Sequence, residues 1–69
     1  MVEVFKTNVE QPEHSEMLID QIINQIPNSQ INFDLEDCDR ILRIEAESVS
    51  NQIIIEILHQ NGYHAEVLI

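Results

Sequence analysis

Hydrophobic residues alternate with polar ones in four short stretches of the chain, which is the spacing of half-buried strands. The first stretch covers residues 2–7 and is rich in strand-forming residues. The next two cover residues 31–35 and 42–45 and are separated by the polar segment Glu36–Asp39, and the last covers residues 64–68. The pattern therefore predicts four strands, the middle two joined by a turn.

Two other stretches repeat their hydrophobic residues at helical spacing. In the first, Ile19, Ile22, Ile23 and Ile26 lie on one stripe, and Pro27 ends the helix because proline disfavours helical conformation in the residue before it. The second stripe begins after Ser48, a favourable N-cap, and ends before Gly62, which suits the left-handed residue after a helix. Its members are Val49, Ile53, Ile54, Ile57 and Leu58.

The predicted order is strand, helix, strand, strand, helix, strand. Two crossover helices joined through a hairpin place both helices on one face of a four-stranded antiparallel sheet. We therefore expect an α+β, ferredoxin-like βαββαβ domain that takes up residues 1–69.

The charge balance is strongly acidic, with thirteen Asp and Glu against three Lys and Arg and a net charge of −10. Nucleic acids and anionic lipid both require clustered basic residues, so neither is an expected partner. No stretch approaches the length of a membrane span, and residues 1–8 lack the features of a signal peptide. Together with a single cysteine, these features predict a cytoplasmic location.

Three motifs resemble the heavy-metal-associated domain family, the fold of copper chaperones. The chain has Ile23-x-x-Ile26-Pro27-Asn28 where the family often has Leu-x-x-Leu-Pro-Gly. The strand at residues 31–35 and the segment Ile54-x-x-x-Leu58-x-x-x-Gly62-Tyr63 also fit the family. The resemblance covers nearly the whole chain and implies the same ferredoxin-like fold.

The family binds Cu(I) through a Met-x-Cys-x-x-Cys loop before its first helix. An ungapped count back from Pro27 places this loop on Glu10–Ser15, with Pro12 and Ser15 at the two cysteine positions. Neither residue supplies a thiolate, so we expect a degenerate member that binds no metal at the family site and uses no cofactor.

Residues of the same loop offer a different metal site. Glu10, Glu13 and His14 present carboxylate and imidazole ligands that would suit zinc or nickel. The alternative is that these residues form only a solvated, acid-biased helix N-terminus. Cys38 lies between Asp37 and Asp39, whose charges oppose thiolate formation, so we expect an incidental turn thiol, the alternative being an intermolecular disulfide or a metal contact.

A hydrophobic patch is predicted on the open face of the sheet. If Val2 and Val4 face the helices, then Phe5 points away from them, together with Ile41 and Leu68 on neighbouring strands. The alternatives are a reversed phase of the first strand or isolated surface residues.

These features predict a non-catalytic domain that binds another protein or forms a homodimer through the open sheet face or an edge strand. The alternative hypothesis is a metal-binding or metal-homeostasis protein with non-cysteine ligands. No Ser/His/Asp, Cys/His or paired-carboxylate arrangement can be identified in the sequence, so an enzyme is not predicted.

Overall fold

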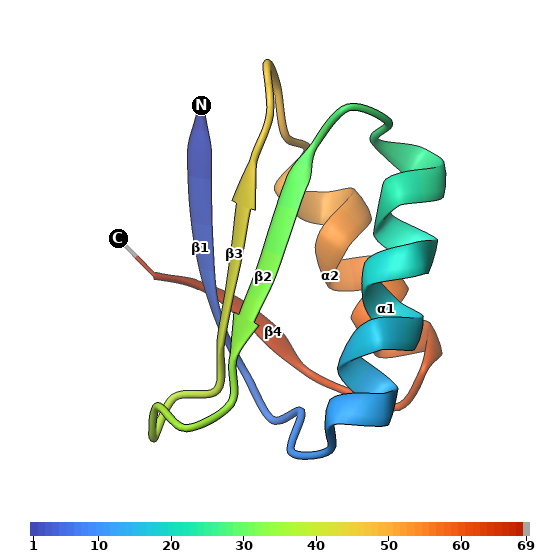
Figure 1. Cartoon of the computed structure of the whole chain (residues 1–69). Helices are drawn as coiled ribbons and strands as arrows, with labels where there is room; N and C mark the ends of the chain where they lie inside the picture. Colours follow the sequence, from blue (N-terminus) through green and yellow to red (C-terminus); the bar gives the residue numbers. More distant parts are fainter. Residues whose placement is uncertain (69) are drawn as a thin grey trace.

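Four strands and two helices alternate along the chain in a computed structural model that describes residues 1–68. The elements are β1 (Val2–Thr7), α1 (Pro12–Gln25), β2 (Gln30–Asp34), β3 (Ile41–Glu45), α2 (Asn51–Gln60) and β4 (Ala65–Leu68). The strands form one antiparallel sheet in the order β2-β3-β1-β4, and both helices cover the same face of it (Figure 1). This is the predicted ferredoxin-like α+β fold, which the structure confirms.

The first helix turns a different stripe toward the sheet from the one that the sequence predicts. Leu18 and Ile22, four residues apart, are fully buried, and Ile26 continues the row after the helix has ended. Ile23, a predicted member of the buried stripe, is 41% exposed. The difference arises because Ser15 and Leu18, which precede the predicted stripe, also face the sheet, so the buried face of the helix is rotated away from Ile23.

The second helix begins two residues later than predicted. Ser50, not Ser48, is its N-cap, and the Ser50 hydroxyl accepts a hydrogen bond from the Ile53 backbone N–H at 3.5 Å. Ile54, Ile57 and Leu58 are buried, whereas Ile53 is exposed. Gly62 follows the helix with φ +85°, which confirms its predicted left-handed role.

A single hydrophobic core fills the space between the sheet and the helices. Phe5 is the core residue from β1, and Leu42 and Ile44 are those from the adjacent β3. The buried core consists of Phe5, Val9, Leu18, Ile22, Leu42, Ile44, Ile54, Ile57 and Leu58. Within residues 1–68, no helix is long and apolar enough to cross a membrane.

Candidate interaction surface

The face of the sheet turned away from the helices carries a row of hydrophobic side chains. Along each strand every second residue points away from the core, so the face is read directly from the alternation of burial. Its hydrophobic members are Val2 and Val4 on β1, Ile41 on β3 and Leu68 on β4. Val2 is 45% and Leu68 is 37% exposed, while Val4 and Ile41 are half-buried. We call these four residues the open-face row.

The strand register places two members of this row directly opposite one another. Val4 lies directly opposite Arg43 on β3 and opposite Leu68 on β4. Directly opposed residues on one face of an antiparallel pair have their Cβ atoms about 4.5–5.5 Å apart. Val4 and Leu68 therefore form a contiguous hydrophobic surface, flanked by the aliphatic stem and the charge of Arg43.

Phe5 does not belong to this surface, and its prediction as a patch residue was wrong. The Phe5 side chain is fully buried in the core, and Val4 occupies the open-face position predicted for Phe5. Ile41 and Leu68 do point away from the helices, as the patch hypothesis requires. The phase of β1 is thus the reverse of the one that the hypothesis assumes.

Two contributions favour the observed phase of β1. The inward position of Phe5 buries a large aromatic side chain, and Val9, just beyond the strand, is fully buried as well. Thr7 also points inward, where its hydroxyl donates a hydrogen bond to the Arg40 carbonyl oxygen at 2.6 Å. The same hydroxyl accepts from the Val9 backbone N–H at 3.3 Å, so the buried polar group is satisfied.

The open face is nearly neutral, although the chain as a whole is strongly acidic. Two cations and three acids point from it, a net charge of −1 out of the total of −10. These residues are Lys6, Arg43, Asp34, Glu45 and Glu66. Lys6 Nζ lies 3.7 Å from Asp39 Oδ1, and Arg43 Nη1 lies 3.8 Å from Glu45 Oε1. By contrast, α1 and α2 contain four acids and neither lysine nor arginine.

The alternative metal ligands in the β1–α1 loop do not converge. Among residues 1–68, the only three His, Cys, Asp or Glu side chains whose ligand atoms approach within 4.8 Å of one another are Asp37, Cys38 and Asp39. Glu10 instead lies 3.9 Å from the Arg40 guanidinium. His14 Nδ1 is hydrogen-bonded to the Tyr63 hydroxyl, which directs this ring nitrogen toward another side chain. Glu10, Glu13 and His14 are therefore not placed as a common site.

The group at Asp37, Cys38 and Asp39 belongs to the exposed turn between β2 and β3. The Asp37 carboxylate accepts a hydrogen bond from the Asp39 backbone N–H at 2.8 Å, and the Asp37 carbonyl accepts from the Arg40 N–H at 3.0 Å. Cys38 is exposed and free. The Asp37 carboxylate therefore helps to close the turn. An aspartate carboxylate that accepts a hydrogen bond from the backbone N–H two residues later is common in turns.

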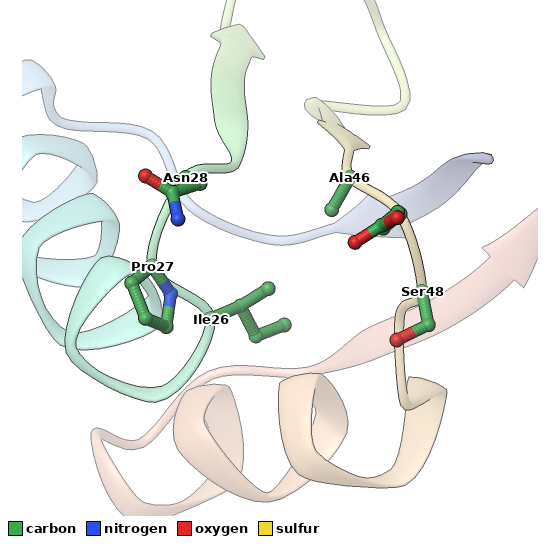
Figure 2. Close-up of a pocket in the computed structure, with 6 residues that line it drawn as sticks. Ile26, Pro27, Asn28, Ala46 and Ser48 are labelled. Atoms are coloured by element: carbon green, nitrogen blue, oxygen red, sulfur yellow. The ribbon is translucent and has the colours of Figure 1, made fainter.

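A hollow of about 310 Å³ lies at the opposite end of the molecule from the β1–α1 loop (Figures 1 and 2). It separates the turn at residues 26–28 from the segment at residues 46–48. The Ile26 side chain points into the space between them, while Asn28 and Ser48 lie on facing sides (Figure 2). Ile26 thus gives the hollow a hydrophobic side chain in its interior, and Asn28 and Ser48 give it polar side chains on its walls. The hollow is separate from the open-face row.

No family model, curated protein or solved structure matches this chain. The resemblance to heavy-metal-associated domains therefore stays a prediction from sequence motifs, whereas the ferredoxin-like fold is observed.

Proposed function

We propose that this chain is a non-catalytic protein-interaction domain that binds its partner through the open face of the sheet. The observation that carries the proposal is the open-face row, whose side chains point away from the core. Both helices lie against the other face of the sheet (Figure 1). A contiguous hydrophobic surface of this kind is characteristic of contact sites, because its exposure to water is unfavourable.

Other exposed hydrophobic residues support this choice by contrast. Met17 and Ile23 on α1 and Ile53 and Ile55 on α2 are 36–41% exposed. They share their helices with Glu13, Glu16, Asp20 and Glu56, with no lysine or arginine to balance them. A contact over the helical layer would desolvate carboxylates that no lysine or arginine of the helices balances, which makes this layer the less favourable contact surface.

Charge also bears on the class of partner. All three basic residues lie within 4 Å of a carboxylate, which leaves ten of the thirteen acidic residues without an ion pair in residues 1–68. Binding of nucleic acid depends on releasing counterions from phosphates with free lysines and arginines. The proposal is accordingly restricted to protein partners.

Photo-crosslinking tests the proposal. A benzophenone amino acid replaces Val4 in one variant and Ile55 in another, and each is expressed in cells that carry the natural gene. Ile55 is the matched control, because it is a branched aliphatic residue exposed on the other layer. We expect protein adducts from position 4 and none from position 55. Adducts from position 55 alone, or from neither position, would refute the proposal.

A further inference from the structure

We infer that the partner at the open face is a second copy of this chain, in a symmetric dimer whose two sheets pack face to face. This inference rests on the proposed function, since it names the occupant of the same surface. It is drawn from the distribution of charge, from the composition of the face and from its size.

The distribution of charge allows two copies to meet at the open face without strong repulsion. The open face carries a net charge of −1, and the remainder of the chain carries −9. Contact between two helical layers would oppose acidic residues with acidic residues. Contact through the open faces brings together two surfaces of low net charge and keeps the acidic layers on the outside of the dimer, where they are solvated.

The composition of the face is suited to pairing with itself. A two-fold contact places one patch against an identical patch, so the patch must contain both members of each attractive pair. The open face satisfies this requirement, with hydrophobic Val4 and Leu68 adjacent to one another and both signs of charge around them. Within residues 1–68, Asp34 and Glu66 have no cation within 4 Å, whereas Lys6 and Arg43 form only long, exposed ion pairs. Such pairs are weak and can exchange for partners on the second copy.

The small size of the face favours a weak dimer. Four strands about 4.8 Å apart and five residues long at about 3.4 Å per residue span roughly 19 by 17 Å. Each copy then presents a flat face of about 320 Å² in projection, which is the size of a small, transient contact and not of a stable interface that buries roughly 800 Å² of accessible surface per partner. We therefore expect a weak dimer that forms in the micromolar to millimolar range of protein concentration.

The response to salt separates a second copy from a basic protein partner. Two copies that each carry −10 repel at long range, and the screening length falls from about 30 Å at 0.01 M salt to about 8 Å at 0.15 M. Added salt therefore strengthens self-association. A basic partner would be attracted by the same charges, so its binding would weaken with salt.

Analytical ultracentrifugation of the purified chain tests the inference at low and at physiological salt. We expect a dimer fraction that rises with protein concentration and with salt. Val4→Glu and Leu68→Glu each raise the dissociation constant by at least about tenfold, because they oppose like charges across the contact. Ile55→Glu is the matched control: it adds the same charge to the helical layer, so it leaves the dissociation constant nearly unchanged at physiological salt, where long-range repulsion is screened. Circular dichroism establishes that each variant is folded.

A chain that is monomeric at millimolar concentration and physiological salt would overturn the inference. So would a dimer that is weakened by Ile55→Glu and not by the two open-face variants. Neither result removes the proposed function if position 4 crosslinks to a foreign protein in cells. Conversely, failure of crosslinking at position 4 together with a monomeric chain would remove both.

Discussion

The Thr7 hydroxyl donates a hydrogen bond to the carbonyl oxygen of Arg40, 33 residues away along the chain. The bond joins the end of β1 to the residue before β3, where Arg40 itself has the left-handed φ of +46°. It thereby holds the inward side of β1 in place, and the inward side determines which residues form the open face.

Replacing Thr7 by valine tests this role. Valine has nearly the same shape and a good strand propensity, but it leaves the Arg40 carbonyl and the Val9 N–H without the bonds that they make to the hydroxyl. We expect the free energy of unfolding to fall by about 1 to 2 kcal/mol in urea titrations, and the Val9 amide to exchange faster with solvent. An equal or higher stability of the valine variant would show that hydrophobic burial at position 7 outweighs the hydrogen bonds.

Neighbouring positions 4 and 5 are expected to respond in opposite ways to the same substitution. Phe5→Glu removes a fully buried aromatic side chain, which lowers the free energy of unfolding by about 3 to 5 kcal/mol. The cost of burying the new carboxylate is added to this loss. A domain of this size has little stability to spare, so we expect this variant to be unfolded by circular dichroism. The glutamate of Val4→Glu would point to solvent beside Arg43, so this variant should remain folded, with a change of about 1 kcal/mol in the free energy of unfolding. If the Phe5→Glu variant were folded and the Val4→Glu variant unfolded, Phe5 would face solvent and Val4 the core, as predicted from sequence.

The first strand illustrates what local pattern determines and what it does not. Alternation locates β1 at residues 2–7, but Val2 and Val4 on one side compete with Phe5 on the other, and either phase satisfies the period of two. The choice depends on Val9 beyond the strand and on the Arg40 carbonyl, a distant partner. The patch prediction consequently placed Ile41 and Leu68 correctly and Phe5 incorrectly.

The helix boundaries show a similar division. Pro27 and Gly62 mark helix ends through backbone restrictions that act locally, and both predicted ends agree with the structure. Ser48 and Ser50 are equally good caps by residue type, so composition does not determine the start of α2. The β1–α1 loop can be aligned with a metal-binding motif, but whether its side chains meet depends on tertiary geometry.

Gly62 supplies a third test, which concerns backbone strain alone. Its φ of +85° is unfavourable for any residue with a Cβ, yet a Cβ at this position would have no heavy atom within 4 Å beyond its chain neighbours. We therefore expect Gly62→Ala to lower the free energy of unfolding by about 1 kcal/mol through conformation and not through a clash. Gly62→Asn should recover part of this loss, because asparagine tolerates the left-handed region better than alanine. A larger loss for asparagine than for alanine would point to a steric cause instead.

The hydrogen bond between His14 and Tyr63 predicts a structural role for the histidine. It connects the first turn of α1 to the residue after Gly62, near the start of β4. We expect His14→Ala and Tyr63→Phe each to cost about 1 kcal/mol in urea titrations, and the double variant to cost less than their sum. Additive losses would show that the two side chains are not coupled.

The same His14→Ala variant tests the alternative metal hypothesis. Because Glu10, Glu13 and His14 do not converge, calorimetric titration with zinc or nickel should give the same result with and without the His14 imidazole. Saturable binding that disappears in the variant would show that the loop rearranges around a metal ion.

Charge reversal on the open face gives the most direct test of its near neutrality. Lys6→Glu combined with Arg43→Glu changes the net charge of the face from −1 to −5 without altering the open-face row. If two copies meet at this face, the dissociation constant of the dimer should rise by at least about tenfold at physiological salt, because uncompensated carboxylates would be opposed across the contact.

Arg40→Glu is the control for this experiment. Arg40 lies outside the strands and pairs with Glu10, so its reversal adds negative charge to the chain but not to the open face. We expect it to weaken the dimer only through long-range repulsion, an effect that added salt removes. The dimer of the Lys6→Glu and Arg43→Glu double variant should stay weak at high salt, since the new carboxylates would be desolvated within the contact. Loss of both effects at high salt would mean that total charge, and not the open face, governs association, since the double variant adds four negative charges to the chain and Arg40→Glu adds two.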